Sequence, residues 1–264
     1  MMSAHTMDRA EFTARISGRL IVSCQAPNGH ALRESSVIGR MARAAQDGGA
    51  AAVRCGGVGG VADVAAVAAA VGVPVIGLTK EGVEGVYITP TIASALEVLR
   101  AGASVVAADG TGRPRPDGSS LGDLVAAVHR VGGLLMADVS TLGEGIAAYT
   151  AGADLIATTL AGYTPYSAHA DAGPDMELLT ALRAALPDAP LVAEGRYHSP
   201  ESAGAAIAAG ATSVVVGTAI TDPAWITRGF AAAVDRSAAA ARHPRHPRRP
   251  RGGGAGGGGE RSVR

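Results

Sequence analysis

The sequence predicts an eight-stranded α/β barrel, and three observations lead to this expectation. The chain has 264 residues, close to the roughly 250 typical of such a barrel. Hydrophobic residues make up 47 % of it and charged residues only 17 %, which excludes disorder as its general state. Short β-branched runs alternate with longer Ala/Leu-rich segments of helical spacing over residues 19–238, and this alternation occurs eight times.

Each expected strand is a short, nearly continuous apolar run, which is typical of a parallel sheet covered by helices. The expected strands are Leu20–Gln25, Ala51–Cys55, Val73–Lys80, Ser104–Asp109, Leu134–Val139, Leu155–Thr159, Leu191–Glu194 and Ser213–Gly217. A segment with apolar residues at helical spacing follows each of them. The expected helices are Val37–Gln46, Val61–Ala70, Ile92–Leu99, Leu121–Arg130, Leu142–Thr150, Asp175–Leu186, Pro200–Ala208 and Pro223–Val234.

The residues between these segments supply the helix ends. Five expected helices are followed by Gly, at residues 48–49, 102, 132–133, 152 and 210, where Gly readily takes the left-handed conformation that ends a helix. Ser120 precedes one helix, and Ser199 followed by Pro200 begins another. A closed (β/α)8 barrel is the simplest arrangement of eight such units, and a doubly wound open sheet is the alternative.

Domain organisation follows from composition. Residues 1–18 are an N-terminal extension, residues 19–238 the catalytic barrel, and residues 239–264 a tail rich in Pro, Arg and Gly that we expect to be disordered. Residues 237–264 hold seven Arg and one acidic residue, which leaves 16 basic and 22 acidic side chains, about −6, in residues 1–236. A solvated extension is the main interpretation of the tail, and binding to an anionic surface is the alternative.

Several partner classes are disfavoured. Aromatic residues are only 3 % of the chain, too few for a nucleic-acid stacking platform. Two cysteines do not form a disulfide framework. Residues 1–20 carry charges where a signal peptide needs an apolar run, and no uncharged apolar segment of the sequence is long enough to span a membrane. We therefore expect a cytoplasmic protein with a small-molecule substrate, without nucleic-acid or membrane partners.

Polar side chains gather where the expected strands end, which in a barrel is the catalytic face. Lys80 ends the third strand and is the only Lys in the chain, which indicates a role that Arg cannot fill. A Lys that is partly desolvated can lose its proton, whereas Arg stays charged. Lys80 is therefore a candidate general base or Schiff-base amine. The alternative is a surface Lys in a chain that otherwise uses Arg.

Carboxylates end three other strands: Glu194, Asp138 and Asp109. Glu194 could orient Lys80 or exchange protons with a substrate, and the two Asp side chains could bind sugar hydroxyls. The alternative for each acid is a charge at the barrel mouth that Arg54 or Arg196 neutralises.

The turns after strands seven and eight match a common phosphate site of barrels. They contain Gly195–Arg196 and Gly217–Thr218, in which Gly allows close backbone approach and Arg196 offers a bidentate guanidinium. Structural Gly at two strand ends would give the same pattern.

Three other motifs are weaker. Residues 57–62 match the G-x-G-x-x-A dinucleotide pattern, but the chain has 37 Gly. The seven His show no metal-binding spacing, so we expect no metal. Cys24 and Cys55 on neighbouring strands are interpreted as core residues, with a nucleophile as the alternative.

Taken together, the strand-end phrases resemble the N-acylmannosamine-6-phosphate 2-epimerase family. The matching stretches run in order through residues 20–26, 74–80, 113–118, 136–142, 158–164, 193–196 and 215–221. The resemblance implies cofactor-independent interconversion of N-acetylmannosamine 6-phosphate and N-acetylglucosamine 6-phosphate, with Lys80 as base at C2 and Glu194 as its acidic partner. It also implies sugar contacts from Gln25, Arg54 and Asp138, and phosphate contacts from the Gly195–Arg196 and Gly217–Thr218 turns.

The chain departs from the family pattern at two places. The family often has Arg where this chain has Asp222, which removes one expected phosphate contact, and Ala-Asn where this chain has Cys55–Gly56, next to Arg54.

The same chemistry is consistent with the residues themselves. The C2 proton of an open-chain 2-acetamido sugar is acidic because the C1 aldehyde delocalises the carbanion, so the site needs a base, enolate stabilisation and a grip on the phosphate. An NAD(P)-dependent oxidoreductase and a non-catalytic sugar-phosphate sensor are the alternatives. The apolar segment 225–233 further suggests a homodimer.

Overall fold

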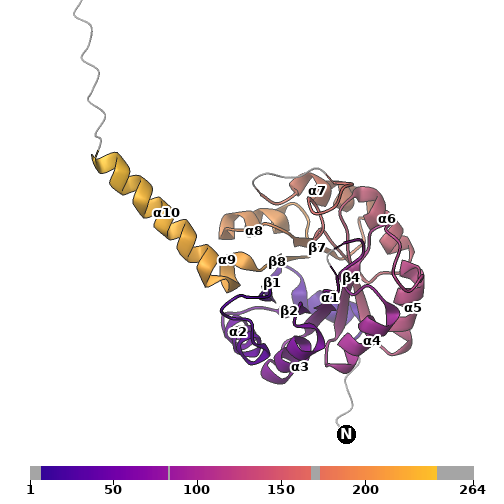
Figure 1. The fold of residues 1–264 in the computed structure, drawn as a ribbon. Coiled ribbons are helices and arrows are strands. Elements are labelled where there is room, and N and C mark those ends of the chain that lie inside the picture. Colours follow the sequence, from indigo (N-terminus) through magenta and orange to yellow (C-terminus); the bar gives the residue numbers. More distant parts are fainter. Residues whose placement is uncertain (1–6, 83, 168–172, 243–264) are drawn as a thin grey trace, which may run out of the picture. The chain divides into compact units, whose positions relative to one another are not determined.

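The computed structural model describes residues 7–82, 84–167 and 173–242, and its eight parallel strands close into a barrel (Figure 1). Each strand pairs with the next in sequence, and β8 pairs with β1, so the open-sheet alternative is excluded. The strands are β1 (Arg19–Cys24), β2 (Ala52–Gly57), β3 (Val75–Thr79), β4 (Val105–Asp109), β5 (Leu134–Asp138), β6 (Leu155–Ala157), β7 (Leu191–Glu194) and β8 (Ser213–Val216).

Helices follow every strand, as the sequence predicted. They are α1 (Arg9–Ile16), α2 (Ser35–Asp47), α3 (Gly60–Ala70), α4 (Ile92–Arg100), α5 (Leu121–Arg130), α6 (Leu142–Thr150), α7 (Met176–Ala185), α8 (Pro200–Ala208), α9 (Thr218–Thr221) and α10 (Pro223–Arg242). Three of them, α5, α6 and α8, begin and end at the predicted residues, because Ser120, Thr141 and Ser199 each cap a helix and a Gly at positive φ follows it. Of the helices that the structure describes, none is long and apolar enough to cross a membrane.

The two ends of the chain differ from the expectation. Helix α10 continues to Arg242, beyond the predicted end at Val234 and into the segment assigned to the tail; the rest of that tail lies outside the described residues. The compact unit that contains the barrel ends at Ile226, and residues from Thr227 onward form a separate unit.

The N-terminal extension contains a helix that belongs to the barrel. Helix α1 buries Phe12 and Ile16 completely, in the same apolar cluster as Ile21, Leu134 and Leu155 from inside the barrel. Asp8 caps the helix by accepting a hydrogen bond from the Glu11 N–H group, at 2.8 Å. The extension therefore closes the end of the barrel where the strands begin.

Alternation along the strands divides the core into two layers. Ala52, Leu78 and Met136 belong to the cluster inside the barrel, whereas their strand neighbours Val53 and Ala137 pack outward against the helices. The inward positions that follow Ala52, Leu78 and Met136 hold Arg54, Lys80 and Asp138, so a layer of polar side chains covers the barrel core toward the carboxyl ends of the strands.

Candidate active site

This polar layer contains most of the side chains predicted to act in catalysis. Arg54, Lys80, Asp138 and Glu194 each lie two positions beyond an inward-facing apolar residue, so all four point into the barrel. Above them is a cavity of about 470 Å³ at the carboxyl ends of the strands, the face where barrel enzymes carry their active sites. The predicted site residues that line it are Gln25, Lys80, Glu194, Gly195, Arg196, Gly217 and Thr218.

Arg54 and Asp138 lie below the surface of this cavity. They are 1 % and 0 % exposed, and Arg54 donates two hydrogen bonds to the Asp138 carboxylate, at 3.0 and 2.6 Å. Arg54 Nη1 also donates to Glu194 Oε2 at 2.6 Å. A buried guanidinium is thus shared by two carboxyl groups, and its pairing with Asp138 offsets the cost of burying these two charges.

The departure at Cys55–Gly56 leaves the position of Arg54 intact. Gly56 has φ +111°, and a Cβ there would lie 1.9 Å from the Leu78 carbonyl oxygen on the neighbouring strand. The close pairing of β2 with β3 therefore requires Gly at this position. Cys24 on β1 and Cys55 on β2 are register neighbours with free thiols, and both side chains pack outward into the core. Burial raises the pKa of both thiols, as expected for core residues.

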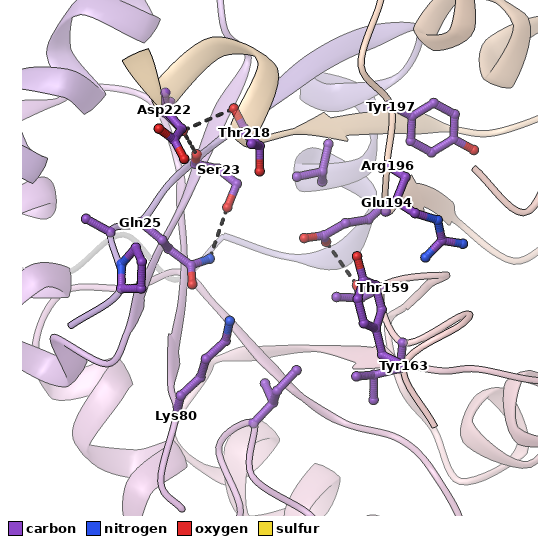
Figure 2. Close-up of a pocket in the computed structure, with 18 of the residues that line it drawn as sticks. Ser23, Gln25, Lys80, Thr159, Tyr163, Glu194, Arg196, Tyr197, Thr218 and Asp222 are labelled. Carbon is purple, nitrogen blue, oxygen red and sulfur yellow. Dashed lines mark hydrogen bonds between the residues drawn. The ribbon is translucent and has the colours of Figure 1, made fainter. Parts of the chain in front are cut away.

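Lys80 projects into the cavity from the end of β3 (Figure 2). Its backbone N–H donates to the Gly57 carbonyl at 2.9 Å, and Lys80 pairs with Ile88 in an isolated antiparallel bridge, so its backbone is held on both sides. Lys80 is exposed to the open cavity, and its partial loss of water there lowers its pKa; the positive charge of Arg54 acts in the same direction, while Glu194 and Asp138 oppose it. Lys80 therefore gives up its proton more readily than a surface Lys does.

Glu194 enters the cavity from β7 and is not ion-paired with Lys80 in the described structure (Figure 2). Its carboxylate contacts Arg54 and also lies 3.0 Å from Thr159 Oγ1. Burial raises the pKa of Glu194 to about 7, while the positive charge of Arg54 opposes this effect. Glu194 can therefore hold or release a proton near neutral pH.

Thr159 is the central residue that sequence analysis passed over. Its hydroxyl lies 2.7 Å from Asp138 Oδ1 as well as 3.0 Å from Glu194 Oε2. Thr159 lies two positions after Ala157, which faces the inside of the barrel, so its side chain points to the same side. This alternation is the sequence signal that could have identified it.

The two turns predicted to bind phosphate lie at the cavity but differ in their side chains. The Arg196 guanidinium donates to the carbonyl oxygens of Ala161 and Gly173, at 2.8 and 2.6 Å, and stacks on Tyr163 at 5.3 Å. The guanidinium therefore stabilises the segment after β6 and does not offer the bidentate phosphate contact that the sequence suggested. Arg196 has φ +60° and follows Gly195 at φ +111°, so the two backbone N–H groups of this turn are set by an uncommon conformation.

The turn after β8 leads directly into α9, which begins at Thr218. The N–H groups of Ile220 and Thr221 donate to the Gly217 carbonyl, whereas those of Thr218 and Ala219 have no acceptor among the described residues. The same holds for the N–H groups of Gly195 and Arg196. Four backbone donors at one side of the cavity thus remain available to an anion.

Asp222 stands at the outer wall of the same side. Its Oδ1 lies 3.4 Å from His30 Nε2 and accepts the Trp225 N–H at 2.9 Å. Since the Leu32 N–H donates to His30 Nδ1 at 3.1 Å, the neutral His30 ring carries its proton on Nε2, facing Asp222.

Other candidates have structural partners. Asp109 accepts hydrogen bonds from Thr111 and from Arg113, whose guanidinium lies at 2.6 Å, and it is absent from the cavity lining. Its charge is therefore neutralised, but by Arg113 and not by Arg54 or Arg196. Asp63, in the first turn of α3 and directly after the dinucleotide-like residues 57–62, accepts hydrogen bonds from Arg33 and Ser35. Within the described ranges, no three His, Cys, Asp or Glu side chains are grouped to hold a metal ion.

Comparison with known proteins identifies relatives of the whole barrel. A family model described as "Putative N-acetylmannosamine-6-phosphate epimerase" matches residues 38–236. Relatives described as "Putative N-acetylmannosamine-6-phosphate 2-epimerase" come from Corynebacterium glutamicum, 50 % identical over 84 % of this chain and 96 % of the relative, and from Cutibacterium acnes, 48 % identical over 82 % and 94 %.

A solved structure, titled as the N-acetylmannosamine-6-phosphate 2-epimerase from Clostridium perfringens, matches with a TM-score of 0.79 at 43 % identity. The match covers 84 % of this chain and 95 % of that one. Because this family model covers most of the chain and these relatives are 43–50 % identical over most of its length, the chain belongs to the N-acetylmannosamine-6-phosphate 2-epimerase family.

Proposed function

We propose that this protein interconverts N-acetylmannosamine 6-phosphate and N-acetylglucosamine 6-phosphate by removing and returning the proton at C2. The two sugars differ only in configuration at that carbon. The reaction therefore requires one group that takes the proton from one face and a proton source for the other face.

The observation that carries this proposal is the position of Lys80 and Glu194 on opposite walls of one cavity. Lys80 follows β3 and Glu194 ends β7, four strands apart in a barrel of eight. A substrate seated between them would present one face of C2 to the amine and the other to the carboxyl group. The lowered pKa of Lys80 and the raised pKa of Glu194 bring both groups toward the range in which either can exchange a proton.

Each step conserves charge and protons. The neutral Lys80 amine takes the C2 proton, and the electron pair of the C–H bond moves into the enolate formed with the C1 carbonyl. The protonated Glu194 then gives its proton to the opposite face of C2, which leaves the Lys80 ammonium and the Glu194 carboxylate. The two groups regain their starting protonation states through solvent, and the reverse reaction runs through the same states.

The remaining site residues would hold the substrate around this axis. We propose that the free N–H groups at Gly195, Arg196, Thr218 and Ala219 bind the phosphate. Gln25 donates to Ser23 Oγ at 3.0 Å and lines the cavity, which supports its expected contact with the sugar. Arg54 and Asp138 are buried, so we propose that they act by holding Glu194 rather than by touching the sugar.

Direct conversion tests the proposal. N-acetylmannosamine 6-phosphate is incubated with the purified full chain in the absence of any cofactor, and the product is followed by proton NMR. Formation of N-acetylglucosamine 6-phosphate is the expected result. Tight binding without conversion would instead support the sugar-phosphate sensor, and activity only with a nicotinamide would support the oxidoreductase.

The homodimer expected from the sequence is also a proposal. Phe230 and Val234 on α10 are 71 % and 66 % exposed, and large apolar side chains in such positions favour a protein contact. Sedimentation equilibrium of the full chain, compared with a Phe230→Ser variant, tests it: a dimer that the substitution weakens is expected, and a monomeric parent protein would contradict the proposal.

A further inference from the structure

The Thr159 hydroxyl faces two carboxylates but has one proton to donate. Its oxygen lies 2.7 Å from Asp138 Oδ1 and 3.0 Å from Glu194 Oε2, both within hydrogen-bond distance. Ionised carboxylates only accept hydrogen bonds. If both acids were ionised, the Thr159 hydroxyl could donate fully to only one of them. Its oxygen would then face the lone pairs of the other carboxylate oxygen at about 3 Å in a buried site, unless the single hydrogen were shared between both acids. A proton on one carboxyl group lets both contacts be full hydrogen bonds.

The surrounding charges indicate which acid carries that proton. Asp138 receives two hydrogen bonds from the Arg54 guanidinium and is fully buried, so its negative charge is compensated. Glu194 receives one such bond through Oε2, and its side chain is 12 % exposed to the cavity. The shorter contact assigns the Thr159 proton to Asp138. A protonated Glu194 then completes the chain by donating to Thr159 Oγ1 while it accepts from Arg54.

Arg54 Nη1 also lies 3.5 Å from Thr159 Oγ1, and no further charged side chain among the described residues has a hydrogen bond to that hydroxyl. The uncharged Ser23 and Gln25 line the cavity at the end of β1, and Val215 and Gly217 line it at the end of β8, while Asp109 of β4 is paired with Arg113. Lys80 faces Glu194 across the cavity from β3. The titratable groups on the outer wall are Tyr87, Tyr163, Arg196, Tyr197, His198 and Asp222.

We propose that Thr159 is a positioning residue that accepts a hydrogen bond from Glu194 and thereby holds it in the protonated form that returns the proton to C2. This inference rests on the proposed function, in which Glu194 serves the face opposite Lys80. It assigns the second proton to a chain of groups, Arg54, Asp138, Thr159 and Glu194, instead of to Lys80 alone.

Removing the hydroxyl gives an effect with a defined sign. In Thr159→Val, Glu194 loses the acceptor for its proton, so its titration midpoint should move to lower pH. A hydroxyl that instead donates to Glu194 would favour the carboxylate, and its removal would move the midpoint to higher pH. Thr159→Ser keeps the hydroxyl and is the matched control.

The titration is read from the infrared band of the protonated carboxyl group in the full chain, assigned by its loss in Glu194→Gln. We expect the Thr159→Val midpoint to fall. In the direction in which Glu194 donates, we expect kcat to fall about 3- to 10-fold near neutral pH, the effect of one hydrogen bond, with KM changed less than about 2-fold. Thr159→Ser should restore both quantities, and thermal unfolding shows whether each variant is folded.

An unchanged or raised midpoint in folded Thr159→Val, or a Thr159→Ser that titrates like the Val variant, would overturn the inference. The infrared titration needs no turnover, so its outcome is separate from the proposed function. If the parent protein fails to convert the sugar phosphate, the proposed function falls, while the titration still decides the role of the hydroxyl.

Discussion

Replacing Arg54 with Met tests how far the buried charge cluster holds the site together. The substitution keeps an unbranched side chain of similar length but leaves Asp138 without two hydrogen bonds and Glu194 without one, at 2.6 to 3.0 Å in the parent. Removing one partner of a buried ion pair costs about 3–5 kcal/mol in the free energy of unfolding. For a barrel of this size that equals a fall in Tm of about 6–20 °C.

The same variant should show a pH dependence of known sign. Arg54 lowers the pKa of Glu194, so its removal raises that pKa further, and the unpaired carboxyl groups take up protons as the pH falls. The stability deficit relative to the parent should therefore be larger at pH 8 than at pH 5. Differential scanning calorimetry at both pH values measures it.

A double mutant separates charge pairing from packing. Arg54→Met combined with Asp138→Leu replaces the pair by apolar groups, so its loss of stability should be smaller than the sum of the two single losses by more than about 1 kcal/mol. A loss below about 1 kcal/mol in Arg54→Met at pH 8, or additive losses in the double mutant, would refute the reasoning.

Three further predictions concern the reacting groups and the phosphate side. Lys80→Ala should abolish turnover while keeping substrate binding by calorimetry, and Lys80→Arg should be equally inactive because a guanidinium stays protonated; a near-parental rate in either variant would reassign the base. Because burial raises the pKa of Glu194 from its ordinary value of 4.5 to about 7, the stability it contributes is complete below pH 4.5 and is lost as the pH rises through about 7. Glu194→Gln should remove that part of the pH dependence in chemical denaturation, and an unchanged profile would contradict the assignment. Asp222→Arg should lower the KM for the phosphorylated sugar about 10-fold relative to Asp222→Asn, since the guanidinium adds a charge-assisted hydrogen bond to phosphate that a neutral amide does not make; equal KM values would place the phosphate elsewhere.

The barrel was predictable because its signals are local. Each strand is a short apolar run, and Ser120, Thr141 and Ser199 mark helix starts directly in the sequence. Helix α1 was not identified, because its apolar residues Phe12 and Ile16 become informative only when the open end of the barrel that they close is known. The length of α10 was underestimated because the Ala-rich residues after Val234 continue it without a stop signal.

The candidate site could be predicted as a set of positions but not as a network. Strand ends identified Lys80 and Glu194, yet the sequence paired them with each other, whereas the structure pairs Glu194 with Arg54 and places Thr159 beside it. Arg196 shows the same limitation, because a guanidinium next to a phosphate-type turn can extend toward the ligand or fold back on a carbonyl oxygen. The position of the Ala161 carbonyl, in the segment after β6, decides between these two orientations, and the sequence does not reveal it.

The measurement that tests the central claim most directly is the fate of the C2 hydrogen during one turnover in deuterium oxide. If proton removal and return at C2 are the chemistry of the cavity, N-acetylglucosamine 6-phosphate formed from the protiated substrate carries solvent deuterium at C2. Conversion in which the original C2 hydrogen is wholly retained would contradict it.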